Sequence, residues 1–303
     1  MNKAVFAAGL LMLSGFALAQ SCEKSFQSVG DPRNGLFFSG QVKVPGLSAQ
    51  SALGQLQQIA LDSGYKVGGE LIKGGAGELY FIQDSNNPAV VMLATADKSG
   101  KVSISTKLAR GQKTDAAAVR TEFCSLLAKL KTGKEGDAIA AVARETTGIN
   151  KVTDAKAEKL SAEIGKVVKK ALAPVAAKGQ LSRALIGTGV SASSGEYEEA
   201  FASVRAKYIG RKYRVDGQIY TVTGSPLHGD MEVNYLVTKT RGLLGVRQET
   251  QFNDLNYQIK CALAKDQAKF FLTLSEGNFA TLTGTVVNMQ PGGLVLGDCR
   301  QAN

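Results

Sequence analysis

The pattern of apolar and polar residues changes twice along this chain, and its first third mixes strands with helices. Short runs rich in β-branched and aromatic residues predict strands at 35–44, 65–72, 78–83, 89–94 and 101–108. Apolar residues at helical spacing predict helices at 48–62, where Leu53, Leu56 and Ile59 share a face, and at 115–130. One strand, a helix, four strands and a helix favour an antiparallel sheet with helices packed on one face.

The middle third has a helical pattern. Helices are predicted at 135–147, 154–173 and 196–208. Pro174 limits the second of these, because the residue before a proline is pushed out of the helical conformation. A Gly/Ser-rich stretch at 187–195 is expected to be a flexible linker. Along one side of the third helix lie side chains that we interpret as core: Tyr197, Phe201, Val204 and Tyr208.

From residue 208 onward the pattern is all-β with one short helix. Strands are predicted at 217–225, 231–237, 257–263, 278–288 and 293–298, and a helix at 266–274. Three strands, a helix and two strands is the order of an OB-fold barrel. We therefore expect a leader at 1–19, an α+β domain at 20–132, a basic helical segment with the linker at 133–207, and an all-β OB-fold barrel at 208–303.

Motifs in this last region carry a resemblance to a known family. They are Thr221–Gly224 (TVTG), Ile259–Cys261 (IKC), Leu282–Val286 (LTGTV) and Leu294–Cys299 (LVLGDC). In these motifs the chain resembles the tRNA-anti-like OB-fold family of exported bacterial proteins, over less than a third of its length. The resemblance implies a small barrel, in which we expect Gly224 and Gly284 to let strands coil. It implies no RNA substrate, because a fold does not fix a function.

The N-terminus has the three parts of an export signal. Lys3 supplies the positive charge, residues 4–16 are mostly apolar, and residues 17–19 (ALA) are small where a signal peptidase reads them. We expect cleavage before Gln20 and a periplasmic or secreted protein. The alternatives are a buried N-terminal helix and a lipoprotein modified at Cys22, for which Gln20 is a poor neighbour. No later run is apolar enough to span a bilayer.

Four cysteines follow the leader: Cys22, Cys124, Cys261 and Cys299. An even number of cysteines in an exported chain predicts two disulfides. Of the three possible pairings we prefer Cys22 with Cys124 and Cys261 with Cys299, because each loop then closes inside one expected domain. Each bridge would add roughly 3–4 kcal/mol by restricting the unfolded chain. A zinc site is the alternative, which the lack of a CxxC pair and the single histidine disfavour.

The formal charge of +10 is concentrated in the middle of the chain. Residues 125–213 hold 16 basic and 9 acidic side chains. One face of the helix predicted at 154–173 is crowded with Lys156, Lys159, Lys166, Lys169 and Lys170. Such a stripe suits nucleic acid, a membrane surface of anionic lipid or an acidic partner, and it is also the ordinary pattern of a solvated helix face, which we favour.

The barrel offers candidate ligand-binding side chains in its strands and long loop. The aromatic rings are Tyr220, Tyr235, Phe252 and Tyr257, and the cations are Lys239, Arg241 and Arg247. Single-strand nucleic-acid binders combine exposed rings with a positive groove. Residues 214–303 contain 8 basic and 8 acidic side chains, which disfavours a groove that follows phosphates.

The chain shows no pattern that points to a specific catalytic chemistry. Its one histidine, His228, stands in the turn 225–230 near a serine and an aspartate, but a triad needs three-dimensional geometry that close spacing does not supply. We predict no catalysis, no cofactor and no metal. The expected function is a periplasmic binding or structural protein whose barrel contacts a protein partner or an envelope component. An oligonucleotide-binding protein and an envelope hydrolase are the alternatives.

Overall fold

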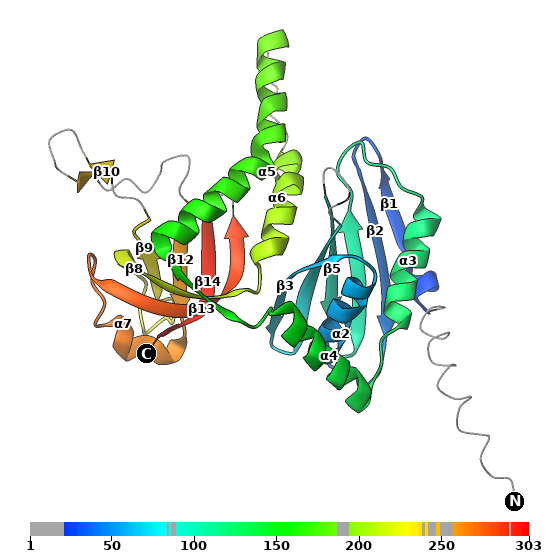
Figure 1. Cartoon of the computed structure of the whole chain (residues 1–303), viewed down its shortest axis with the longest axis horizontal. Helices are drawn as coiled ribbons and strands as arrows, with labels where there is room; N and C mark the ends of the chain where they lie inside the picture. The colour runs from blue at the N-terminus through cyan, green and yellow to red at the C-terminus, as the bar shows by residue number, and fades with distance from the viewer. Residues whose placement is uncertain are drawn as a thin grey trace, which may run out of the picture. The chain divides into compact units, whose positions relative to one another are not determined.

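The computed structural model describes residues 21–83, 85, 89–186, 194–237, 240–241, 247–248, 257–290 and 292–302, with the backbone course alone at 176–186, 194–199, 240–241 and 247–248. The predicted leader lies outside the described residues. The chain forms two compact units, of which the first ends at Ile149 and the second begins at Asn150. Figure 1 shows a sheet with helices in the first unit and a barrel with helices in the second.

The first unit is the predicted antiparallel sheet with helices on one face. Its elements are β1 (Gln27–Asp31), β2 (Gly35–Lys43), α2 (Ala49–Asp62), β3 (Lys66–Lys73), β4 (Ala76–Gln83), β5 (Val90–Ala96), β6 (Lys101–Lys107), α3 (Ala116–Ala128) and α4 (Gly133–Thr147). The strands run in the order β1-β2-β6-β5-β4-β3, and every neighbouring pair is antiparallel. The short edge strand β1 is an addition that the sequence pattern did not predict.

One hydrophobic core joins the sheet to α2 and α3. Leu53 of α2 and Phe123 of α3 are buried against the sheet residues Phe38 and Phe81. The start of α2 is set by Ser48, whose side chain accepts a hydrogen bond from the Ser51 amide at 3.1 Å, as a helix N-cap does. The alternation of buried and open positions along β4, β5 and β6 therefore places one face of the sheet under the helices.

The helix α4 belongs to the first unit, so the structure divides the chain later than the boundary expected after residue 132. Arg144 of α4 makes a two-point ion pair with Glu70 of β3, with N–O distances of 2.9 and 2.7 Å. A Cβ built on Gly54 of α2 would lie 2.5 Å from the Cβ of Ala140, so the two helices approach closely. A helix held by a buried ion pair and close packing cannot act as a connecting segment.

The second unit consists of a barrel and the helices around it. Its elements are β7 (Val152–Lys156), α5 (Ala157–Ile186), α6 (Ser194–Tyr208), β8 (Lys212–Thr223), β9 (Glu232–Tyr235), β10 (Thr240–Arg241), β11 (Arg247–Gln248), β12 (Gln258–Leu263), the 3₁₀ helix η1 (Lys265–Gln267), α7 (Ala268–Phe271), β13 (Phe279–Gln290) and β14 (Gly293–Gln301). Five strands close in the order β8-β9-β12-β14-β13-β8, and β7 adds a sixth strand beside β8. The pair β12–β14 is parallel, whereas the other pairs around the ring are antiparallel.

The rest of the segment expected to connect two domains, from residue 150 to 207, is part of the second unit. Residues 152–156 form β7, which pairs in parallel with β8, so the long helix begins at Ala157 and not at residue 154. Ser161 of α5 accepts a hydrogen bond from the Tyr257 amide at the start of β12, at 2.8 Å. Phe201 and Tyr208 of α6 are buried, as predicted, together with Val204. The side chain of Tyr197 lies outside the described residues.

Pro174 lies inside α5 and does not end it. The helix continues to Ile186, and Figure 1 shows it changing direction along its length. A proline inside a helix removes one backbone hydrogen bond and bends the axis, and an adjacent helix can stabilise the bent form. Here α6 packs beside α5, which explains why the local signal did not decide the helix end.

The two glycines expected to let barrel strands coil have different roles. Gly224 has a φ of +93° and begins the loop after β8, a conformation that favours glycine. A Cβ on Gly284 would lie 2.5 Å from the sulfur of Cys299, so this glycine makes room for a disulfide. The pairing of β8 passes from β13 to β9 at a register shift between Ile219 and Thr221, where the strand coils.

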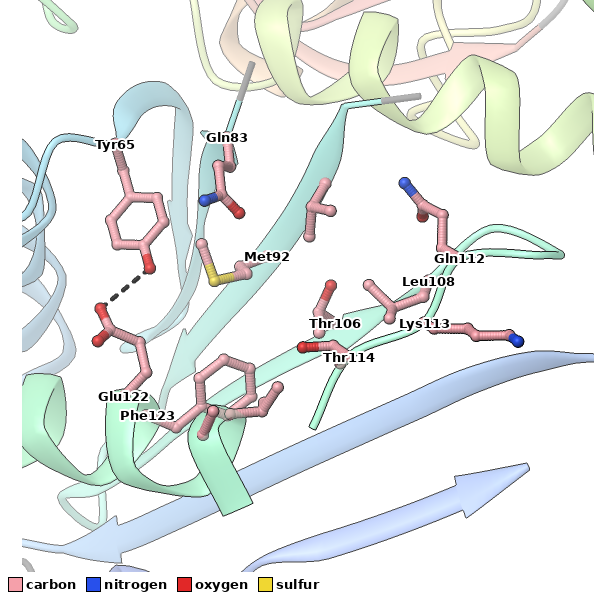
Figure 2. Close-up of a pocket in the computed structure, with 13 residues that line it drawn as sticks. Tyr65, Gln83, Met92, Thr106, Leu108, Gln112, Lys113, Thr114, Glu122 and Phe123 are labelled. Atoms are coloured by element: carbon pink, nitrogen blue, oxygen red, sulfur yellow. Dashed lines mark hydrogen bonds between the residues drawn. The ribbon is translucent and has the colours of Figure 1, made fainter. Parts of the chain in front are cut away.

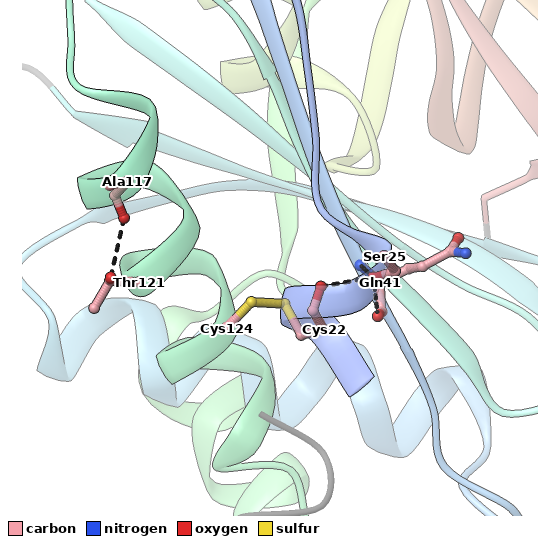
Figure 3. Close-up of a disulfide and its surroundings, with 6 residues drawn as sticks. All are labelled: Cys22, Ser25, Gln41, Ala117, Thr121 and Cys124. Atoms are coloured by element: carbon pink, nitrogen blue, oxygen red, sulfur yellow. Dashed lines mark hydrogen bonds between the residues drawn. A yellow bond between two sulfur atoms is a disulfide. The ribbon is translucent and has the colours of Figure 1, made fainter. Parts of the chain in front are cut away.

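Both predicted disulfides are confirmed. Cys22 in a helical turn at the chain start is bonded to Cys124 of α3, and Ser25 in the same turn binds the β2 backbone at Gln41 (Figure 3). Cys261 of β12 is bonded to Cys299 of β14, the two adjacent parallel strands. A sulfur bonded to Cys124 cannot also carry a lipid, which removes the lipoprotein alternative. Among the helices that the structure describes, none has both the length and the apolar character to cross a membrane.

Candidate binding site

Two of the predicted ligand-binding tyrosines lie inside the second unit. Tyr235 is 0 % exposed, and its hydroxyl donates towards the carbonyl oxygens of Val215 at 3.1 Å and Ala280 at 3.4 Å. Tyr257 is buried under α5. Burial raises the pKa of both phenols, because the low-dielectric interior disfavours the charged form. These rings are core residues and present no face to a ligand.

The remaining predicted residues are not brought together into one site. Tyr220 is half-buried on β8. Arg241 and Arg247 pair through their backbones across the two-stranded ribbon β10–β11. Lys239 and Phe252 lie outside the described residues. The predicted ligand-binding residues that the structure describes therefore lie in three places: on a barrel strand, in the barrel interior and in the ribbon.

The outer face of β8, β9 and β12 carries a polar group that the sequence analysis did not single out. Asn234 of β9 is 5 % exposed and donates a hydrogen bond to Thr221 Oγ1 of β8 at 3.0 Å, while its Oδ1 has no partner among the described residues. Beside it, the Lys260 ammonium lies 3.3 Å from the Glu232 carboxylate. A buried amide oxygen without a donor is uncommon and costs free energy, so this face has an unmet hydrogen-bond acceptor.

The loop between β8 and β9 is held by its own hydrogen bonds. Asp230 Oδ1 accepts from the Ser225 amide at 2.8 Å, and the Ser225 hydroxyl accepts from the Leu227 amide at 3.2 Å. His228 is exposed in this turn, and Leu227 beside it is 92 % exposed. The serine and the aspartate that flank His228 therefore order the turn backbone.

A concave site lies in the first unit, between the sheet and α3 (Figure 2). It has a volume of about 590 Å³. Its apolar lining comes from both layers: Val90, Met92 and Leu108 from the sheet side, and Ala118, Val119 and Phe123 from α3. Its polar lining consists of Tyr65, Gln83, Thr106, Gln112, Lys113, Thr114 and Glu122. Mixed pockets of this size are typical of small-molecule sites.

A tyrosine–carboxylate pair stands at one side of this pocket. The Tyr65 hydroxyl donates to Glu122 Oε1 at 2.9 Å, and Figure 2 shows the two side chains pointing toward each other. Burial, and then the hydrogen bond to Glu122, raise the pKa of Tyr65 to about 12. Tyr65 is held in turn by the ring of Phe81, 6.5 Å away between centroids. The pair is therefore a fixed, partly desolvated polar group beside the apolar part of a mixed cavity.

The sequence analysis predicted the helix at 115–130 but did not predict a pocket beside it. The decisive pair joins residues 57 positions apart, one at the start of β3 and one in α3. Neither residue type nor local spacing signals such a contact. Within the described residues, no group of three or more histidine, cysteine, aspartate or glutamate side chains is arranged to hold a metal ion.

Comparison of the chain with models of known protein families and with curated protein sequences found no match.

Proposed function

We propose that this chain is an exported, non-catalytic binding protein whose barrel is an OB fold that contacts a protein partner or an envelope component. The observation that carries the proposal is the barrel connectivity, β8-β9-β12-β14-β13-β8 with β12 and β14 parallel. A five-stranded barrel with a helix between its third and fourth strands agrees with that fold. The proposal extends the sequence resemblance to the tRNA-anti-like family to the level of strand order.

The contact surface in this proposal is the outer face of β9 and β12 together with the loop after β8. In OB folds the second and third strands and the loop between the first and second strands form the usual ligand surface. Here that surface includes the ion pair Lys260–Glu232 and the exposed Leu227, whereas Asn234 of β9 is buried. A partner that covers Leu227 and pairs with the charges of Lys260 and Glu232 would contact both groups.

Export is supported by the two buried disulfides. Both bridges lie in the cores of their units, with all four cysteines at most 3 % exposed. Disulfides form and persist in oxidising compartments such as the periplasm and the extracellular space. The leader predicted at 1–19 accounts for delivery to such a compartment.

A charge-swap experiment tests the surface. The variant Glu232→Lys with Lys260→Glu keeps an ion pair but exchanges its charges, so the fold should be retained. A matched control exchanges the pair Asp154–Arg214, which lies on β7 and β8 of the same unit. Each protein is cross-linked in the native envelope, and its captured proteins are quantified by mass spectrometry.

The proposal predicts partners that are captured by the wild type and the control but lost from the first swap. It is wrong if the wild type captures no protein above background, or if both swaps capture the same proteins equally.

A specific observation favours an oligonucleotide as a second candidate ligand. The residues Lys159, Lys166, Lys169 and Lys170 are all exposed on α5, whose other face packs on the barrel. Each cation that meets a phosphate releases a counterion, so affinity falls steeply as salt rises. This candidate is supported by submicromolar oligonucleotide binding at low salt that weakens steeply between 50 and 200 mM salt. Six or more phosphate contacts would weaken the affinity by ~10³-fold or more over that range. No measurable binding at low salt removes it.

A further inference from the structure

We propose that the pocket between the sheet and α3 of the first unit binds a small molecule that joins an apolar body to a protonated amine. This site is separate from the barrel surface considered above, and all its lining residues belong to the first unit. The three observations that support it are an apolar floor, a carboxylate held at one side, and the direction of the one lysine that lines the pocket.

The floor of the pocket is apolar and already buried. Met92, Leu108 and Phe123 contribute to the lining, and each is at most 5 % exposed. Val90 and Val119 complete the apolar part and are partly exposed. An apolar body placed here removes from water its own apolar surface and the exposed parts of Val90 and Val119, at about 25 cal/mol per Å² of apolar area. The volume of about 590 Å³ holds a ring or a short alkyl chain with a polar group.

The carboxylate of Glu122 selects the polar group. Tyr65 donates to Oε1, which fixes the orientation of the carboxylate and leaves Oε2 with no partner among the described residues. A carboxylate accepts hydrogen bonds and donates none, so its complement is a donor. Hydrogen bonds between an ammonium and a carboxylate are about twice as strong as neutral ones, so a protonated amine is the preferred donor.

Among the described lining residues the one lysine, Lys113, does not neutralise Glu122. Figure 2 shows Lys113 at the far side of the pocket with its ammonium group directed away from Glu122. The described contacts include no ion pair between these two residues. The charge that a ligand meets next to the apolar floor is therefore the negative charge of Glu122, which favours an amine and disfavours a carboxylate.

The test compares three probes that share one carbon skeleton: 2-phenylethylamine, 2-phenylethanol and phenylacetate. Binding to the full-length protein is measured by calorimetry and by changes in the NMR signals of the Met92 methyl group. We expect the amine to bind at least tenfold more tightly than the alcohol, and the carboxylate to bind most weakly. Tenfold corresponds to about 1.4 kcal/mol, close to the lower end of the roughly 1.5–3 kcal/mol that a hydrogen bond to a charged group contributes.

Two variants and a control make the assignment specific. Glu122→Gln keeps an acceptor for Tyr65 but removes the charge, and we expect it to lower the affinity for the amine about tenfold while leaving the alcohol unchanged. Ala118→Phe, at an exposed position of α3 that lines the pocket, fills the cavity and should weaken all three probes. Lys98→Ala, which removes an exposed cation of the first unit outside the pocket lining, should leave amine binding intact.

Three results would overturn the proposal. One is equal affinity for the three probes, another is an affinity for the amine that Glu122→Gln does not change, and the third is no binding of the amine at millimolar concentration. Retained far-UV circular dichroism and an intact Cys22–Cys124 bridge in each variant show that the comparison is made on folded protein.

Discussion

Each disulfide of this protein lies against a strand glycine. A Cβ on Gly40 of β2 would lie 3.2 Å from the sulfur of Cys22, and a Cβ on Gly284 of β13 would lie 2.5 Å from the sulfur of Cys299. The first distance is tight and the second is a collision. The space that the bridge occupies therefore requires Gly284 and favours Gly40, and neither has a positive φ that would explain it through the backbone.

The substitution Gly284→Ala should destabilise the second unit by about 1–3 kcal/mol, the usual cost of overpacking a core. In a background of Cys261→Ala with Cys299→Ala the same substitution should cost less, because the nearest sulfur is gone. The control is Gly292→Ala, where a Cβ meets nothing within 4 Å. Urea denaturation gives the free energies, and an equal cost of Gly284→Ala in both backgrounds would contradict the explanation.

Tyr65 gives the pocket a measurable property, because its pKa is raised to about 12 from an ordinary value of 10. The folded protein then holds this proton more tightly than the unfolded chain does. The contribution of Tyr65 to the free energy of unfolding is fully present below about pH 10. It is lost as the pH rises from about 10 to about 12. The tyrosinate absorbance that Tyr65→Phe removes should accordingly develop near pH 12.

The variant Glu122→Gln should lower that pKa only in part, because burial is the larger cause of the shift and remains. An ionisation of Tyr65 that is complete by pH 10 in the wild type would show that the pair is open to solvent.

The helix α4 shows how a short polar network assigns an element to a unit. The side chains of Arg144 and Glu70 are 11 % and 4 % exposed, and Arg144 also donates to the backbone oxygen of Gln50 in α2. Further along, Gln55 of α2 binds the backbone of Lys131 through both its amide atoms. The helix is thus held by hydrogen bonds to two elements of the sheet-and-helix unit.

Removing one partner of the buried ion pair Arg144–Glu70 should lower the free energy of unfolding much more than replacing both partners by apolar residues. We expect Arg144→Ala to destabilise the first unit by about 3–5 kcal/mol, because the Glu70 carboxylate is then buried without a counter-charge. Arg144→Met together with Glu70→Leu should recover most of this loss. Glu135→Ala breaks an exposed ion pair between α4 and Lys131, which precedes the helix. Its free energy of unfolding should remain close to that of the wild type. Chemical denaturation measures the free energy of unfolding of each variant. Equal losses in Arg144→Ala and in the double variant would be inconsistent with a buried pair.

The molecule as a whole is stabilised by one disulfide in each unit. The bridge Cys22–Cys124 spans 102 positions and the bridge Cys261–Cys299 spans 38. Both close within a unit that has its own core, so neither bridge ties the two units to each other. Each unit therefore depends on its own bridge for the restriction of its unfolded chain.

Replacing both cysteines of one bridge by alanine should lower the stability of that unit alone. The chain-entropy estimate is about 5 kcal/mol for Cys22–Cys124 and about 4 kcal/mol for Cys261–Cys299. Hydrogen exchange followed by mass spectrometry reports the two units separately, and the unit with its bridge intact serves as the internal control. A loss of protection in both units from either pair of substitutions would mean that they unfold as one body.

The local pattern of apolar and polar residues predicted an element well where that element has one buried face and one exposed face. The helix with Leu53 and Leu56 inward follows from the helical spacing of its apolar residues. It failed at Pro174, because packing against α6 decides whether the helix continues. It also failed at residues 152–156, where pairing with β8 outweighs the helical pattern.

By itself the sequence determined the element types apart from β1 and β7, and the order of strands around one helix in the C-terminal region, and it favoured the disulfide pairing that the structure contains. These follow from periodicity and from the location of cysteines, which are local or combinatorial properties of the chain. Only the tertiary structure decided that Tyr235 and Tyr257 are core residues, that α4 joins the first unit, and that Tyr65 meets Glu122 beside a cavity of mixed lining. The physical reason is that burial and hydrogen-bond partners depend on what packs over a side chain, and those neighbours come from distant parts of the chain.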